Sequence, residues 1–186
     1  MNKGRLVVYT GVMYSDKTYN LLTKYNELKE QGLRVLLCKP DIDKRFSETF
    51  VVSRKDGLKA KVDLILSVNY PDSLLHSVDL KEVKAVFIDE VQFFTENIYF
   101  TVLELLDRGV VIYVSGLTYD FKHLFFGFTH KLVELADLVV INNPVCALCD
   151  NTAERSFRFT DSTQQILIGN GDIYKPLCVS CYNKQE

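Results

Sequence analysis

Short, almost continuously apolar segments alternate with helical segments along most of this chain. The apolar segments are 6–10, 34–38, 85–88, 110–114 and 138–141. Apolar residues recur at helical spacing between them, which predicts helices over 17–31, 95–107 and 130–137, the first two ended by Gly32 and Gly109. Strands without a polar side belong to parallel sheets that helices cover on both faces. The sequence therefore predicts an α/β fold.

The rest of the chain has weaker patterns. The polar segment 43–60 is predicted to be a loop with a short strand at Val51–Ser53, while 62–68 and 73–78 are assigned no type. After Pro144 the sequence turns to short strands and turns between paired cysteines. We therefore expect a larger domain over 1–144 and a small one over 145–186.

Composition restricts the function. The chain has 186 residues, 47% of them hydrophobic and 25% charged, which is enough to bury a core. A net charge of −2 argues against binding to polymeric nucleic acid or to a membrane surface. Neither a membrane-spanning apolar run nor a signal peptide is evident, so a cytoplasmic location is expected.

The segment after the first strand resembles a phosphate-binding loop. It reads G-V-M-Y-S-D-K-T, against the pattern G-x-x-x-x-G-K-[ST] between a strand and a helix. Lys17 would reach the β- and γ-phosphates, and the Thr18 hydroxyl would ligate Mg²⁺. The candidate nucleotide-binding residues of this loop are Gly11, Val12, Met13, Tyr14, Ser15, Asp16, Lys17 and Thr18. A strand–turn–helix with a chance Lys-Thr pair is the alternative.

Asp16 occupies the position of the second glycine. A carboxylate about 5 Å from a phosphate oxygen costs about 3 kcal/mol per unit charge at an effective dielectric constant of about 20. Pairing with Lys17, or turning outward to solvent, would relieve this repulsion.

An acidic pair follows the strand at 85–88. Asp89 stands where phosphate-loop enzymes place a carboxylate for Mg²⁺, at the carboxyl end of a strand. Glu90 could accept a proton from an attacking hydroxyl. A solvated acidic turn is the alternative. However, the loop segment and this acidic pair occur in the order found in phosphate-loop enzymes, and each follows the end of a strand.

Four of the five cysteines form two C-x-x-C pairs. Cys146, Cys149, Cys178 and Cys181 supply the four thiolates of a tetrahedral structural Zn²⁺ site. The segment between the pairs offers few core residues, so a metal ion would stabilise it. Reduced surface thiols are the alternative, and Cys38 lies within an apolar strand as a small core residue.

Together these segments resemble the cellular-type thymidine kinase family of bacteria, eukaryotes and large DNA phages. Besides the loop, the matching segments are K-P-D-I-D-K-R-F at 39–46, S-R-K-D-G at 53–57, I-D-E-V-Q-F-F at 88–94, G-L-T-Y-D-F at 116–121, L-x-E-L-A-D at 132–137, V-C-A-L-C at 145–149, I-G-N-G-D-I-Y at 168–174 and L-C-V-S-C-Y at 177–182. The ordered set covers nearly the whole chain.

The resemblance implies a phosphate-loop NTPase-like sheet and a small zinc-bound lasso domain that closes over the nucleoside. It implies transfer of the γ-phosphate of Mg²⁺-ATP to the 5′-hydroxyl of thymidine or deoxyuridine, with Glu90 as the general base. Further nucleotide contacts by resemblance are Asp43, Lys44, Arg45, Asp89 and Gln92. The residues that would enclose the nucleoside are Met13, Phe93, Leu117, Phe121, Gln165, Ile166, Leu167, Ile168, Gly169 and Tyr174.

Two alternatives to an active kinase remain open from the sequence. The first is a paralogue that binds nucleoside but transfers no phosphate, because Asp16 replaces the loop glycine. The second is another phosphate-loop NTPase with a zinc ribbon, which the matches at 116–121 and 168–174 disfavour. By resemblance we also expect a homo-oligomer, a tetramer in many family members.

Overall fold

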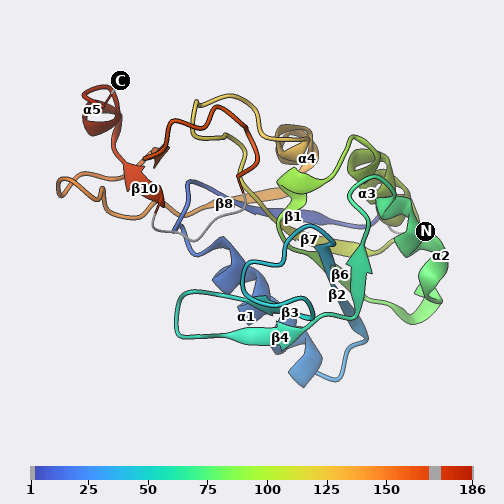
Figure 1. Cartoon of the computed structure of the whole chain (residues 1–186). Coiled ribbons are helices and arrows are strands. Elements are labelled where there is room, and N and C mark those ends of the chain that lie inside the picture. The colour runs from blue at the N-terminus through green and yellow to red at the C-terminus, as the bar shows by residue number, and fades with distance from the viewer. Residues whose placement is uncertain (1–2, 168–172, 186) are drawn as a thin grey trace.

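A six-stranded parallel sheet forms the centre of the molecule (Figure 1). The computed structural model describes residues 3–167 and 173–185. Across the sheet the order is β5-β2-β6-β7-β1-β8. Its strands are β1 (Leu6–Thr10), β2 (Val35–Pro40), β5 (Leu64–Leu66), β6 (Ala85–Ile88), β7 (Val111–Ser115) and β8 (Leu138–Ile141). All five apolar segments that the sequence assigns to strands lie in this sheet, so the predicted α/β fold is confirmed.

Helices pack against both faces of the sheet, as the apolar strands predict. On one face, α1 (Lys17–Glu30) buries Leu21, Leu22 and Tyr25 against side chains of β2 and β6. The other face carries α2 (Leu74–Ser77), α3 (Asn97–Asp107) and α4 (Thr129–Leu135). Short 3₁₀ turns at Pro71–Ser73, Leu80–Glu82 and Val91–Phe93 complete the connections.

The C-terminal ends of α1 and α3 are followed by Gly32 and Gly109, as predicted. Gly32 has a φ of +75°, and its N–H donates to the Lys29 carbonyl at 3.0 Å. The N–H of Leu33 returns to the Leu28 carbonyl at 3.2 Å, which completes a glycine-terminated helix end.

Segment 41–78 is more ordered than the sequence suggests. β3 (Phe50–Val52) and β4 (Lys59–Lys61) form an antiparallel hairpin, and the unassigned segments contain β5 and α2. β2 also extends to Pro40, beyond its predicted end at 38. Proline is tolerated there because the next residue, Asp41, supplies the N–H that bonds the Leu66 carbonyl at 2.9 Å.

The C-terminal part has a small core of its own. β9 (Arg155–Arg158) pairs antiparallel with β10 (Tyr174–Leu177), and α5 (Val179–Tyr182) follows. Cys146, Leu177, Cys178 and Tyr182 are buried together, apart from the two clusters that flank the large sheet. A domain boundary near Pro144 stays a prediction.

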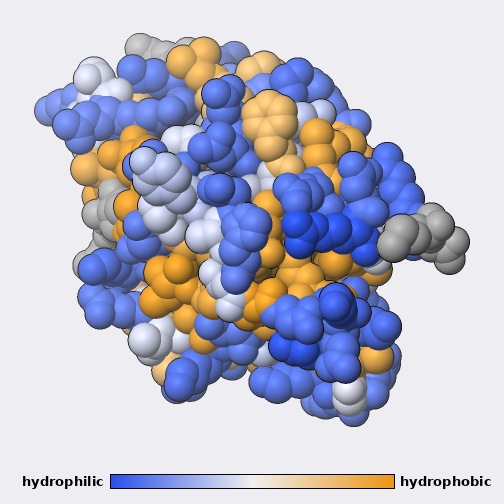
Figure 2. All heavy atoms as spheres, turned by 90° about the vertical axis from the view of Figure 1, so that its right-hand side faces the viewer, coloured by the Kyte–Doolittle hydropathy of each residue, from blue (hydrophilic) through white to orange (hydrophobic). Residues whose placement is uncertain are grey.

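The surface on the side of α2 and α3 is mixed. Figure 2 shows hydrophilic side chains there around smaller hydrophobic areas. On α3, Phe100 is exposed, whereas the buried apolar residues face the sheet: Ile98, Val102, Leu105 and Leu106. In the described ranges, no helix combines the length and apolar character needed to cross a membrane.

Candidate functional site

The carboxyl ends of three neighbouring strands carry the candidate residues. β6, β7 and β1 lie side by side and parallel, so the segments that follow them meet at one edge of the sheet. β1 leads through Gly11 into the loop before α1, and Gly11 has a φ of +136°. A Cβ at Gly11 would lie 2.7 Å from the Asn142 carbonyl oxygen, so this close turn requires glycine.

Lys17, Thr18 and Asp89 come together as the phosphate-loop pattern predicts. The Lys17 ammonium donates to the Val12 carbonyl at 2.7 Å and to the Ser15 hydroxyl at 3.1 Å. Burial lowers the pKa of Lys17 to about 8, against the opposite effect of the Glu90 and Asp89 charges. The Thr18 hydroxyl lies 3.2 Å from one oxygen of Asp89, an arrangement that suits two ligands of one cation.

Asp16 does not pair with Lys17, and that expectation is wrong. Lys17 points into the loop, whereas the Asp16 carboxylate lies 3.0 Å from the Lys55 ammonium. The Asp16 side chain is 39% exposed, so it turns outward to the surface, which is the second of the two expectations. There it pairs with Lys55.

Asp89 is held in a buried position. It is 5% exposed and accepts a short hydrogen bond from the Ser115 hydroxyl. Burial and the neighbouring Glu90 charge raise the pKa of its carboxyl group. A cation bound at Asp89 would lower this pKa again and so offset the effects of burial and of the Glu90 charge.

Arg45 links the two acidic segments. Its Nε lies 2.7 Å from an Asp43 oxygen, and its Nη2 donates a short hydrogen bond to Glu90. The other Glu90 oxygen accepts a short hydrogen bond from the Gln92 side chain, whose Oε1 accepts from the Leu117 N–H at 3.1 Å. Arg45 and Gln92 thus hold the Glu90 carboxylate from two sides.

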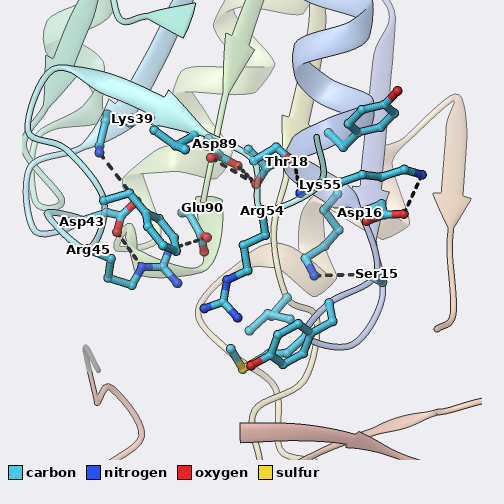
Figure 3. Close-up of a pocket in the computed structure, with 18 of the residues that line it drawn as sticks. Ser15, Asp16, Thr18, Lys39, Asp43, Arg45, Arg54, Lys55, Asp89 and Glu90 are labelled. Atoms are coloured by element: carbon cyan, nitrogen blue, oxygen red, sulfur yellow. Dashed lines mark hydrogen bonds and ion pairs between the residues drawn. The ribbon is translucent and has the colours of Figure 1, made fainter. Parts of the chain in front are cut away.

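An open cavity of about 260 Å³ lies beside these groups (Figure 3). Of the predicted nucleotide-binding residues, it is lined by Met13, Tyr14, Ser15, Asp16, Lys17, Thr18, Asp43, Arg45 and Asp89, and the predicted general base Glu90 lines it as well. Gly11, Val12 and Gln92 do not line it, although they shape the loop and support Glu90. Lys44 lies elsewhere, exposed and 3.2 Å from Glu48.

A second, more aromatic cavity adjoins the first. Of the predicted nucleoside-binding residues it is lined by Met13, Phe93, Leu117, Phe121, Gln165, Ile166, Leu167 and Tyr174. Ile168 and Gly169 lie outside the described residues. Met13, Arg45 and Leu117 line both cavities, so the two spaces meet at these residues.

Sequence reasoning misses several residues of this second cavity. It does not single out Tyr119, Asp120, Phe126 and Ser156, which also line it. Asp120 accepts from the Gln165 side chain at 2.8 Å, and Ser156 accepts from the Met13 N–H at 3.0 Å. Asp120 and Tyr119 belong to the matched segment 116–121, whereas nothing in the local sequence marks Ser156.

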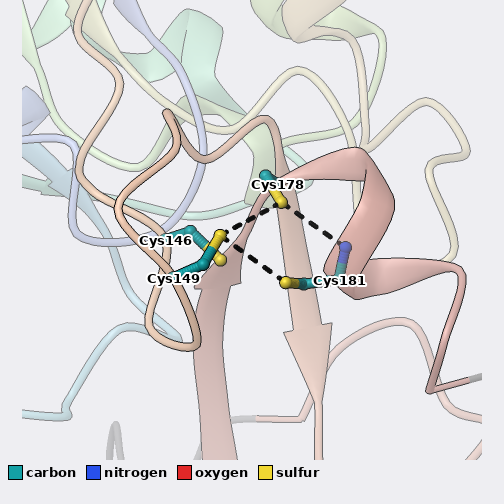
Figure 4. Close-up of side chains that lie close together, drawn as sticks. All are labelled: Cys146, Cys149, Cys178 and Cys181. Atoms are coloured by element: carbon teal, nitrogen blue, oxygen red, sulfur yellow. Dashed lines mark hydrogen bonds between the residues drawn. The ribbon is translucent and has the colours of Figure 1, made fainter.

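The four paired cysteines form one cluster (Figure 4). Their sulfur atoms all lie within 4.8 Å of one another, with Cys149 Sγ 3.7 Å from Cys178 Sγ and 3.6 Å from Cys181 Sγ. Four sulfur ligands at about 2.3 Å from a tetrahedral ion lie about 3.8 Å apart. The cluster could therefore hold a metal ion, and Cys38 is buried in the sheet as predicted.

Known proteins match this chain along almost its whole length. Residues 4–182 match the family model described as Thymidine kinase. A thymidine kinase of Porphyromonas gingivalis is 36% identical over 184 residues, which are 99% of this chain and 87% of that protein. Thymidine kinases of Mycoplasma mobile and Bacteroides fragilis are 33% and 34% identical over 98% of this chain, covering 89% and 88% of their own lengths. The matched range includes both the loop after β1 and the four cysteines.

Proposed function

The chain belongs to the thymidine kinase family, and from this premise we propose that it transfers the γ-phosphate of ATP to the 5′-hydroxyl of thymidine or deoxyuridine. One observation carries the proposal. A cavity with a phosphate loop and an aromatic cavity meet at Met13, Arg45 and Leu117, with Glu90 in the wall of the first. A phosphate donor and a nucleoside bound in these spaces would bring their reacting ends together.

The loop side suits Mg²⁺-ATP. Backbone N–H groups at the start of α1 attract a polyphosphate, and the Lys17 ammonium would exchange its bonds within the loop for phosphate oxygens. Thr18 and Asp89 would hold Mg²⁺, which when bound neutralises charge on the phosphates.

The aromatic side suits a pyrimidine nucleoside. Phe93, Phe121 and Tyr174 offer ring faces for a base, and Gln165 to Leu167 would present backbone groups to its edge. Enclosing the nucleoside excludes water that would otherwise compete for the phosphate.

Glu90 would take the proton in the transfer step. The 5′-oxygen forms a bond to the γ-phosphorus while the bond from that phosphorus to the β–γ bridging oxygen breaks, and ADP leaves. The hydroxyl proton passes to the Glu90 carboxylate, which Arg45 and Gln92 orient. Arg45, facing both cavities, lies where it can also stabilise charge on the moving phosphoryl group.

Membership of the family supports proposals for the metal site and the assembly. We propose that the cysteine cluster holds a structural Zn²⁺ and that residues 145–186 form the lasso domain. We also propose a cytoplasmic homo-oligomer, a tetramer, that acts on small molecules rather than on polymeric nucleic acid. One cavity is lined by the groups that phosphoryl transfer needs, Lys17, Thr18, Asp89 and Glu90, and this supports a kinase rather than a paralogue without transfer.

Replacing Glu90 with Gln tests the proposal. The amide keeps the shape of the side chain but cannot accept the hydroxyl proton. We expect kcat for thymidine phosphorylation to fall about 10²–10⁴-fold, while calorimetric affinities for thymidine and Mg²⁺-ATP change little.

The matched control is Glu82→Gln. Glu82 is exposed and forms a surface ion pair with Arg34 at 3.5 Å, so its loss should leave kcat unchanged. Wild-type protein that binds both ligands without phosphate transfer would instead support the nucleoside-binding paralogue.

A further inference from the structure

The backbone at Asp16 keeps the turn that glycine would make. Its φ of 55° and ψ of 22° place it in the left-handed region. Aspartate is one of the few residue types besides glycine that enter this region readily. The substitution therefore leaves the shape of the loop possible, and the added negative charge becomes the main obstacle to a polyphosphate.

Lys55, from a distant part of the chain, forms an ion pair with the Asp16 carboxylate. It lies in the connection between β3 and β4, 39 residues from Asp16, with its Nζ 3.0 Å from Asp16 Oδ2. The same Nζ lies 4.5 Å from the centroid of the Tyr19 ring on the first turn of α1. The Lys55 backbone is fixed as well, since its N–H donates to the Ser53 hydroxyl at 3.1 Å.

The pair lies at one side of the cavity. Figure 3 shows Asp16 and Lys55 joined on the side opposite Asp43, Arg45 and Glu90, with Arg54 between the two groups. Both side chains are partly exposed, Asp16 at 39% and Lys55 at 45%. An exposed ion pair adds little to folding stability, so its main effect would be on the charge that a bound phosphate meets.

We propose that Lys55 is a positioning residue of the phosphate-donor site: it holds the Asp16 carboxylate at the cavity rim and neutralises it, which makes a loop without its second glycine competent to bind ATP. The inference rests on the proposed function in taking Mg²⁺-ATP as the ligand. Lys55 acts through Asp16, so its contribution depends on the Asp16 charge.

A double-mutant cycle tests this dependence. The four proteins are wild type, Lys55→Met, Asp16→Asn and the double variant, because asparagine keeps the left-handed turn without the charge. We expect Lys55→Met to raise the Kd for Mg²⁺-ATP about tenfold with Asp16 present and less than about twofold in the Asp16→Asn background. The KM for ATP should rise with it, whereas the KM for thymidine and the melting temperature should stay the same.

Lys61→Met is the matched control. Lys61 is exposed on β4 of the same hairpin and does not line the cavity, so its loss removes one positive charge without removing the partner of Asp16. We expect its Kd for Mg²⁺-ATP to stay within about twofold of wild type. The Lys55→Met effect should also shrink in high salt, which screens exposed charges.

Three outcomes would overturn the inference. An equal loss in the wild-type and Asp16→Asn backgrounds would mean that Lys55 contacts ATP directly, and no loss in either would mean that the pair is irrelevant. Wild type that binds thymidine but no ATP would mean that Asp16 is not neutralised. Failure of the proposed function looks different: ATP binds, and the cycle can be measured, but thymidine receives no phosphate.

Discussion

Arg158 is a buried charged residue that contacts two side chains of the aromatic cavity, Phe121 and Tyr174. It is 4% exposed, and its guanidinium carbon lies 3.4 Å from the centroid of the Phe121 ring. Its Nη1 donates to the Gln164 carbonyl at 2.7 Å and reaches the Tyr174 hydroxyl at 3.3 Å. One side chain therefore joins three parts of the proposed nucleoside site.

Replacing Arg158 with Lys should weaken nucleoside binding selectively. Lysine keeps the charge but loses the planar stack and the forked donors, and each lost hydrogen bond to a charged group is worth about 1.5–3 kcal/mol. We expect thymidine affinity to fall about tenfold or more, with the Kd for Mg²⁺-ATP unchanged by calorimetry. Arg155→Lys is the control because Arg155, on the same strand, donates to the neighbouring Glu154 carbonyl at 3.0 Å and does not line the aromatic cavity. Equal losses in both variants would contradict the role of Arg158.

Local motifs predict some site residues and cannot predict others. Lys17, Thr18 and Asp89 follow directly from a strand, a loop and a helix in order, because such loops and strand ends have a fixed geometry. Lys55 and Arg158 have no such signal. Their partners, Asp16 and Phe121, are distant in the sequence and become neighbours only in the folded chain.

Among the secondary-structure elements, the C-terminal hairpin and α5 pack around the cysteine cluster. Tyr182 on α5 donates to the Phe121 carbonyl at 2.6 Å, so this helix is tied to the wall of the aromatic cavity. Cys149 lies within 4 Å of two other sulfurs, Cys178 and Cys181. A metal ion held by these thiolates would fix the hairpin, α5 and Phe121 together.

Removing one thiolate should therefore affect metal and nucleoside together. We expect Cys149→Ser to lower bound zinc below one ion per chain and to weaken thymidine binding strongly, with a smaller effect on Mg²⁺-ATP. Zinc is measured by elemental analysis and binding by calorimetry. Cys38→Ala is the control because Cys38 is buried in β2. This variant should still bind one zinc ion per chain. Full zinc content in Cys149→Ser would rule out a four-cysteine site.

The elements with long apolar patterns are predictable, and the short polar ones are not. α1 and α3 end at glycines in left-handed conformations, and β6 occupies the predicted residues 85–88. β4, in contrast, reads Lys-Ala-Lys with both lysines exposed, so its sequence looks like a loop. It becomes a strand only through pairing with β3, which the local pattern does not encode.

At the scale of the whole molecule, a row of three contacting aromatic side chains connects the core to the site: Tyr25, Phe87 and Tyr113. Phe87 of β6 is fully buried, stacks on Tyr113 with ring centroids 4.7 Å apart, and meets the edge of Tyr25 at 5.4 Å. It thereby packs β6 against β7 and α1. The chain continues two residues later into Asp89, so the position of that carboxylate depends on how well this row packs.

Phe87→Ala should thus destabilise the entire fold. Removing a buried phenylalanine costs about 3–5 kcal/mol, a large part of the roughly 5–15 kcal/mol that holds a domain folded. We expect the free energy of unfolding in urea to drop by that amount, with a lower melting temperature by calorimetry. Phe100→Ala, at a side chain that is 60% exposed, should change it by no more than about 0.5 kcal/mol. Because ligands stabilise only the folded state, saturating thymidine and Mg²⁺-ATP should restore part of the lost melting temperature in Phe87→Ala. A variant that unfolds like wild type would mean that the row is not part of the cooperative core.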